Sequence, residues 1–103
     1  METTRLTKEH FDGNGNFTAD ESLLTARGHI EVDGDLGWLK VPRLVAAGRI
    51  SIEAGSGIEA GEGIEAGSGI EAGWGIKAGE GIEAGEGIKA GWGIKAGEGI
   101  KAG

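Results

Sequence analysis

The sequence predicts an all-β fold, a single-stranded parallel β-solenoid with three six-residue units (18 residues) in each coil and a triangular cross-section. Three observations lead to this prediction. From residue 52 onward, an isoleucine stands at every sixth position of the 103-residue chain. The 23 glycines are periodic, which indicates a repeat architecture and not a disordered chain. Finally, the two tryptophans of the repeat are 18 residues apart.

The repeat unit reads Ile-(Glu/Lys)-Ala-Gly-x-Gly, and each position has a structural reason. In an extended segment the isoleucine and alanine point to one side and the charged residue between them to the other. We expect Gly-x-Gly to turn the chain, because glycine adopts backbone angles that other residues avoid. One unit buries too little apolar surface alone, so coils must stack about 4.8 Å apart. The predicted core column is Ile52, Ile58, Ile64, Ile70, Ile76, Ile82, Ile88, Ile94 and Ile100.

The variable position x favours three units per coil. It is occupied in order by Ser56, Glu62, Ser68, Trp74, Glu80, Glu86, Trp92 and Glu98. Three units per coil stack Trp92 on Trp74, whereas two units per coil place them on opposite sides. The 18-residue step also sets Glu59, Glu71 and Glu83 opposite lysines, but it pairs Glu53 with Glu71 and Lys77 with Lys95. Exposed pairs contribute at most about 1 kcal/mol, so they do not decide the fold.

Residues 24–103 are predicted to form the solenoid, with degenerate hexads over 24–51 and perfect hexads over 52–103. Leu24, Ile30 and Leu36 are six apart, and Leu44 and Ile50 resume the spacing after a two-residue slip around Pro42. Apolar residues also stand two positions after most of them, which is the alternation of a half-buried strand. Val41-Pro42-Arg43 is predicted to be a bulge or corner, because proline cannot donate to a ladder.

Residues 1–23 carry no repeat and are predicted to be an N-terminal tail or cap. A short helix is the alternative for the end of this segment. Thr18-Ala19-Asp20-Glu21 has the spacing of a capping box, and Gly28 stands where a helix could close.

Composition limits the classes of function. The formal net charge is −7, which argues against nucleic acid and anionic membranes as partners. Cysteine is absent, so neither disulfides nor thiolate metal sites form. The chain has no apolar run long enough to cross a bilayer, and its first ten residues lack the apolar region of a secretory signal. The expected location is therefore the cytoplasm.

No arrangement of residues points to catalysis, and no enzyme activity and no cofactor are expected. Asp12-Gly13-Asn14-Gly15-Asn16 opens like a calcium loop, but Phe17 and Leu23 stand where that loop needs Gly and Glu. A plain loop is therefore predicted, with no metal site. His10 and His29 are the only histidines and are expected to be solvated. Trp74 and Trp92 form a possible binding or stacking corner, and the Glu/Lys positions form an outer charged face.

The phrase Gly28-His29-Ile30-Glu31-Val32-Asp33-Gly34-Asp35-Leu36 and the repeated Gly-Ile-(Glu/Lys)-Ala-Gly resemble bactofilins. They resemble still more a group of enterobacterial proteins with long hexad arrays. Bactofilins are right-handed β-helices that polymerise end to end, so the resemblance implies a right-handed polymer-forming solenoid. The repeat is also similar to that of left-handed β-helix acyltransferases. Those usually have a small residue at position x, where this chain has Glu or Trp in six of eight cases, and parallel crossovers are generally right-handed.

The repeat runs to Gly103, and a solenoid that ends there presents an unpaired strand edge. Another copy or a partner then covers that edge, or the chain is a fragment of a longer repeat protein. The predicted function is a structural scaffold that self-associates through the open C-terminal coil. The alternative is a ligand- or glycan-binding module that uses the tryptophan corner or an acidic face.

Overall fold

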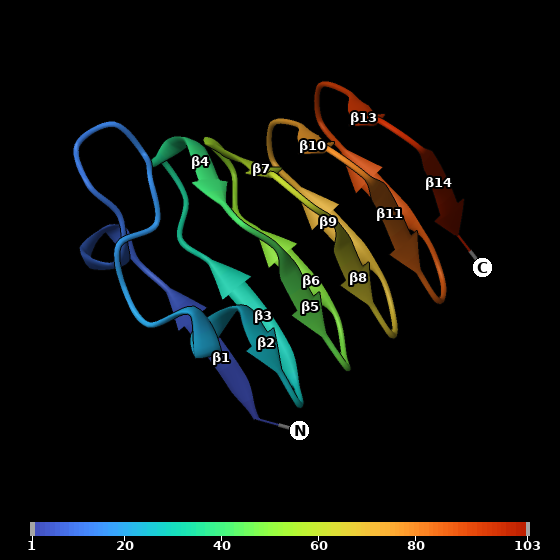
Figure 1. Ribbon diagram of the computed structural model, residues 1–103, viewed down its shortest axis with the longest axis horizontal. Helices are drawn as coiled ribbons and strands as arrows, with labels where there is room; N and C mark the ends of the chain where they lie inside the picture. The colour runs from blue at the N-terminus through green and yellow to red at the C-terminus, as the bar shows by residue number, and fades with distance from the viewer. Residues whose placement is uncertain (1, 103) are drawn as a thin grey trace.

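The computed structural model describes residues 2–102 and confirms a three-sided parallel β-solenoid (Figure 1). The strands form three sheets, which the chain visits in turn as it coils. Sheet 1 contains β1 (Thr3–Leu6), β3 (His29–Val32), β6 (Ile50–Ile52), β9 (Ile70–Ala72) and β12 (Ile88–Ala90). Sheet 2 contains β4 (Gly37–Val41), β7 (Ser56–Ala60), β10 (Ile76–Ala78) and β13 (Ile94–Ala96). Sheet 3 contains β2 (Thr25–Ala26), β5 (Leu44–Ala46), β8 (Ile64–Ala66), β11 (Gly81–Ala84) and β14 (Gly99–Ala102).

The upper coils follow the predicted 18-residue step. Ile76 lies between Ile58 and Ile94 in sheet 2, and all three strands pair in parallel. The corners continue the ladder, because the N–H of Glu98 donates to the carbonyl of Glu80 at 2.7 Å. Glutamates 59, 71 and 83 stand opposite lysines, and Lys77 stands opposite Lys95, all as predicted. Handedness stays a prediction.

The lower coils are wider, which corrects the predicted start of the perfect repeat. Ile50, not Ile52, pairs with Ile70, a 20-residue step. Ile52 pairs with Ala72, so it is buried but belongs to the alanine file and not to the isoleucine column. For the same reason Glu71 faces Ser51 and not Glu53. The perfect 18-residue register therefore begins at Ile58.

Extra residues at one corner cause the wider coils. Val32, Ile52 and Ala72 are in register on sheet 1, and Leu39, Ile58 and Ile76 are in register on sheet 2. Between these positions the lower coils contain the segments 33–38 and 53–57, whereas the coil above has only 73–75. Leu36 was predicted for the core but is half-buried at this corner, and Leu39 takes the buried place below Ile58. Pro42 lies between β4 and β5, so the predicted corner is confirmed, but most of the slip arises before it.

The core consists of vertical files of aliphatic side chains inside the three sheets. Isoleucines and leucines form the larger files, and smaller residues two positions later fill the remaining space. Burial falls along the axis, since Ile58, Ile64 and Ile76 are fully buried while Ile100 is 47% exposed. Each fully buried isoleucine contributes about 1.5–3 kcal/mol relative to an exposed one.

The glycines of the perfect repeat act differently from the prediction. Among residues 2–102 the glycines with positive φ are Gly15, Gly37 and Gly55, and none of them lies in the units from Ile58 onward. From Gly67 onward the first glycine of each Gly-x-Gly is instead required by close contact between coils. A Cβ added at Gly79 would lie 2.1 Å from the carbonyl oxygen of Gly61 below. The second glycine is less restricted: in the inner coils a Cβ at Gly69 would lie 3.2 Å from the carbonyl oxygen of Gly87, and in the last coil a Cβ at Gly87 would meet no atom within 4 Å.

The solenoid begins within the predicted N-terminal tail or cap, because β1 pairs in parallel with β3. It thus starts at Thr3 and not near Leu24. The connection from β1 to β2 contains two 3-10 helices, η1 (Lys8–His10) and η2 (Glu21–Leu24). The helical alternative is therefore correct only for one 3-10 turn, whose N-cap is Asp20 and not Thr18 and which ends at Leu24 and not near Gly28. No helix among residues 2–102 is long and apolar enough to cross a membrane.

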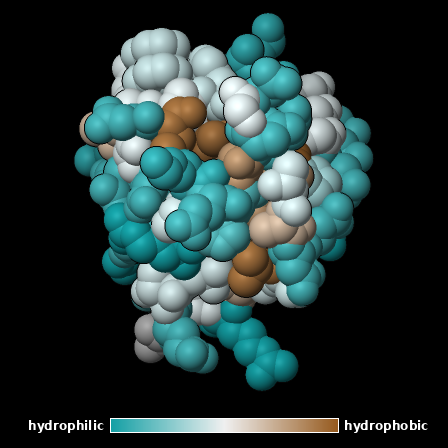
Figure 2. Space-filling view, turned by 90° about the vertical axis from the view of Figure 1, so that its left-hand side faces the viewer, coloured by the Kyte–Doolittle hydropathy of each residue, from teal (hydrophilic) through white to brown (hydrophobic). Residues whose placement is uncertain are grey.

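The β1–β2 connection covers the N-terminal end of the column. Phe11 is 8% exposed and contacts the core, and Phe17 packs against its ring at a centroid distance of 5.6 Å. The backbone of this connection also occupies the free edge of β4, because the N–H of Phe17 donates to the carbonyl of Lys40. Figure 2 looks onto this end, where hydrophilic residues cover most of the surface and a few hydrophobic side chains lie between them.

Candidate functional site: the tryptophan corner and sheet 2

The three corners of the upper coils carry different side chains at position x. The corner between sheets 2 and 3 holds Glu62, Glu80 and Glu98, and the corner between sheets 3 and 1 holds Ser68 and Glu86. The corner between sheets 1 and 2, here called the tryptophan corner, holds Trp74 and Trp92. Each file repeats at the strand spacing of about 4.8 Å.

The predicted stacking of Trp92 on Trp74 is confirmed. The two rings are 4.7 Å apart between centroids and inclined by 7°. Sequence reasoning missed a third member, Trp38 on β4, whose ring meets both indoles edge-on at 6.3 and 6.2 Å. Trp38 lies outside the perfect repeat. The one feature of the sequence that could have placed it on the outer face is its position directly before the inward-pointing Leu39.

Glycines on the outer face of sheet 2 make room for Trp38. Its side chain starts on β4 and runs up across the next two coils. A Cβ at Gly57 would lie 2.9 Å from ring carbons of Trp38, and a Cβ at Gly75 would lie 2.8 Å from another. At these two coils the ring of Trp38 is the nearest group to the second glycine of the repeat, and a backbone carbonyl oxygen of the next coil follows at 3.1 Å.

Sheet 2 also carries a cationic stripe in an otherwise acidic chain. Its outward positions read Lys40, Glu59, Lys77 and Lys95 from the bottom coil to the top. The ammonium of Lys77 lies 5.2 Å from the centroid of the Trp38 ring, within the range of a cation–π contact. Within the described part of the chain, neither Lys77 nor Lys95 forms a salt bridge. Two ammonium groups without a salt bridge among the described residues thus stand one coil apart, and Glu59 stands opposite Lys77 in the coil below.

A shallow hollow of about 430 Å³ lies between the aromatic rings and the lysines. Trp38 and Trp92 border it, Lys77 and Lys95 line it, and Gly93 belongs to its floor. Trp92 is 66% exposed, so its indole is available to a ligand. The two predicted site residues are thus together, and the third tryptophan and the lysines complete the site.

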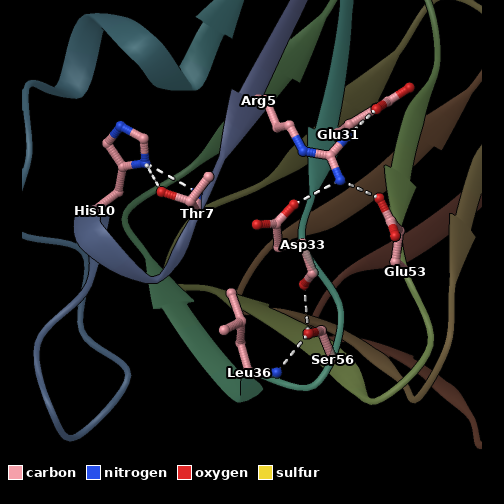
Figure 3. Close-up of polar contacts among 8 residues, drawn as sticks. All are labelled: Arg5, Thr7, His10, Glu31, Asp33, Leu36, Glu53 and Ser56. Carbon is pink, nitrogen blue, oxygen red and sulfur yellow. Dashed lines mark hydrogen bonds and ion pairs between the residues drawn. The ribbon is translucent and has the colours of Figure 1, made fainter.

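Below the tryptophans, a buried hydroxyl holds the wide part of the same corner together (Figure 3). Ser56 is fully buried; its Oγ donates to the carbonyl of Asp33 at 2.7 Å and accepts from the N–H of Leu36 at 3.0 Å. Both groups belong to the segment 33–36 of the coil below, whose Asp35 has a positive φ of 59°. Ser56 therefore fixes the wide loop on which the tryptophan file rests.

Next to this loop, Arg5 joins three coils through acidic residues of the outer face (Figure 3). Its guanidinium lies 2.7 Å from carboxylate oxygens of Glu31 and Asp33 and 2.8 Å from Glu53. Asp33, followed by Glu53, raises the pKa of Arg5 further, although desolvation opposes this. The cluster is exposed, so it contributes to the geometry of the coil more than to the free energy of folding.

The loop that resembles a calcium site is stabilised by its own backbone. The Asp12 carboxylate accepts from the N–H groups of Asn16 and Asn14 at 2.9 and 2.8 Å, and these bonds lower its pKa. Among residues 2–102 no three His, Cys, Asp or Glu side chains are placed to hold a metal ion.

The prediction that the two histidines are solvated is wrong. His10 and His29 are half-buried, and each accepts a hydrogen bond from a backbone N–H through Nδ1.

The acidic face lies on the side of sheet 3. The glutamate file of the neighbouring corner and Glu65 and Glu83 of sheet 3 border a broad hollow of about 620 Å³. Arg43 and Lys101 also line this hollow, so it is not purely anionic.

The last described coil presents the free edges of β12, β13 and β14, which have no further strand beside them within residues 2–102. In the coils below, the N–H of Ile70 and that of Ile76 donate upward to Gly87 and Gly93. By the same register, the N–H groups of Ile88 and Ile94 point beyond the last coil.

Comparison with known protein families, curated sequences and solved structures found no match.

Proposed function

We propose that this chain is a structural β-solenoid that self-associates through the edge of its last coil. The observation that supports the proposal is the difference between the two ends of the column. The β1–β2 connection covers the core at one end, where Leu6 and Leu24 are fully buried. At the other end of the described residues, 2–102, no further strand pairs with the last coil, and Ile100 is 47% exposed.

An unpaired strand edge beside an exposed aliphatic core is a template for pairing with another chain. Two copies joined through their last coils would satisfy the free N–H groups and cover the exposed isoleucine. Because the opposite end is covered, such pairing stops at two copies related by a two-fold axis. We also propose that the repeat is bactofilin-like in associating through the end of its solenoid. In contrast to bactofilins, the expected product is a pair of chains and not a filament.

Light scattering coupled to size-exclusion chromatography tests this proposal. The mass of the wild-type chain is expected to rise from one copy to two as its concentration increases. Ile100→Lys places a charge at the edge and is expected to leave a monomer. Ser51→Lys adds the same charge on the side of sheet 1, between Glu31 and Glu71, and is expected to behave as wild type.

Three results would contradict the proposal. A wild-type chain that stays monomeric at every concentration excludes self-association. Equal assembly of Ile100→Lys and wild type excludes the last coil as the contact. Filaments in negative-stain electron microscopy would contradict the closed pair.

A further inference from the structure

We infer that the hollow above Gly93 on sheet 2 binds one ring of an acidic sugar, such as a hexuronate unit. This inference goes beyond self-association, because it concerns the outer face of sheet 2 and a small ligand, although the hollow reaches the last coil. Three features carry it: an empty floor, a preformed aromatic wall and two unpaired ammonium groups.

The floor is part of a file of glycines on the outer face of sheet 2. Gly57, Gly75 and Gly93 lie above one another, since the N–H groups of Ile58 and Ile76 donate to the carbonyls of Gly75 and Gly93. The Trp38 ring lies over the first two. At Gly93 the file continues, but an added Cβ would meet no atom within 4 Å. The place next to Trp38 is therefore open, because among residues 2–102 no further coil follows Gly93.

The aromatic wall is held in place without a ligand. Trp92 is stacked on Trp74, and Trp38 supports both rings edge-on. Such mutual packing fixes the indoles, so little rotamer entropy remains to be lost on binding. The volume of about 430 Å³ is in the range of small-molecule sites and suits one or two sugar rings.

The lysines determine the charge of the ligand. Lys77 and Lys95 stand opposite each other in register with no salt bridge among the described residues, in a chain of net charge −7. A carboxylate between them would relieve the repulsion of two neighbouring ammonium groups and form charge-assisted hydrogen bonds.

Because the hollow is shallow, the ligand must also have a polar side that stays in water. A ring bound here keeps its outer side in water, as the 66% exposure of Trp92 indicates. A purely apolar ring would gain little, whereas a sugar places its C–H face on the indole and its hydroxyls in the solvent. An acidic sugar therefore fits both the aromatic wall and the cationic edge.

Isothermal titration calorimetry and tryptophan fluorescence with a trigalacturonate probe test the inference. The neutral methyl ester of the same trisaccharide and benzoate are the matched probes. We expect the acid to bind at millimolar concentration or better, with a binding constant about tenfold or more above that of either matched probe. Equal binding of the ester would overturn the role of the lysines, and equal binding of benzoate would overturn the sugar.

Two glycine variants separate the site from the fold. Gly93→Leu fills the floor and is expected to abolish binding. Gly87→Leu is the control, because it fills an equally open position on sheet 1. Lys95→Gln is expected to weaken binding about tenfold. Circular dichroism checks that each variant is folded. No heat or fluorescence change with wild type up to about 10 mM probe, or wild-type binding by Gly93→Leu, would overturn the inference.

Discussion

The lower coils, residues 3–57, and the upper coils, residues 58–102, form the same column by different means. In the lower coils the step between equivalent residues reaches 20, and side chains close the irregular corners, as Ser56 and Arg5 do. In the upper coils the step is 18, and the corners are closed by backbone bonds from one coil to the next. The corners of the irregular part therefore need specific side chains, whereas the corners of the repeat need only small residues at fixed places.

This difference also explains where the candidate site lies. The wide loops of the lower coils and the tryptophans of the upper coils share one corner, and Trp38 crosses from one region to the other. The site is built where the irregular part meets the repeat. Three predictions test the contrast between the two regions.

The largest effect is expected where the repeat permits no Cβ. Gly79→Ala brings a methyl carbon to 2.1 Å from the carbonyl oxygen of Gly61, so the two coils must move apart. We expect the free energy of unfolding to fall by about 2–3 kcal/mol, measured by urea denaturation.

The matched control is Gly87→Ala, the second glycine of its unit. A Cβ there meets no atom within 4 Å, and alanine restricts the unfolded chain. Stability is expected to stay the same or to rise by up to about 1 kcal/mol. Equal loss in both variants would show that backbone conformation, and not contact between coils, requires glycine in the repeat.

A smaller effect is expected from the buried hydroxyl of the irregular part. Ser56→Ala leaves the N–H of Leu36 and the carbonyl of Asp33 without their partner. The expected loss is about 1–3 kcal/mol in urea denaturation. Ser68→Ala changes the same position of another unit, where no side-chain hydrogen bond holds the corner. Its effect is expected to be within about 0.5 kcal/mol, and a comparable loss would end the distinction between the corners.

The smallest effect is a pH dependence confined to the N-terminal connection. Backbone N–H groups lower the pKa of Asp12 and of Asp20 below the ordinary value of 3.8. A lowered pKa in the folded state contributes stability that is present above pH 3.8 and is lost as pH falls through the folded value. When the pH is lowered through this range, the free energy of unfolding of Asp12→Asn is expected to fall less than that of the wild type.

Nuclear magnetic resonance can follow this titration at single residues. The amide signals of Asn14 and Asn16 are expected to shift with a midpoint below pH 3.8. A midpoint at or above that value would mean that these N–H groups do not stabilise the Asp12 carboxylate.

The fold could be predicted because the repeat is simple. Isoleucines at every sixth position have one economical arrangement, and the tryptophan spacing fixed three units per coil. The register of the core column was correct from Ile58 onward, although Ile88 and Ile94 are only partly buried and Ile100 is exposed. The stack of Trp74 and Trp92 was correct. The same rule placed Leu44 and Ile50 in the core, because the spacing between them is unbroken.

The remaining errors arise from corners whose length the apolar pattern does not encode. Leu36 and Ile52 fit the six-residue count, yet the longer corner loops shift the register by two or three residues. β1 was missed because a single strand of four residues has no repeat to identify it. Trp38 could not be placed, since its contacts depend on a side chain that spans two coils.

The 18-residue closure of the upper coils makes the length of this protein a modular quantity. Inserting one further set of three units would lengthen the column by about 4.8 Å and give every neighbour the same surroundings as before. A second copy of residues 76–93, for example, would add one indole, two lysines and three glutamates. Duplication of part of the gene could therefore change both the length of the column and the number of side chains that it presents to a partner.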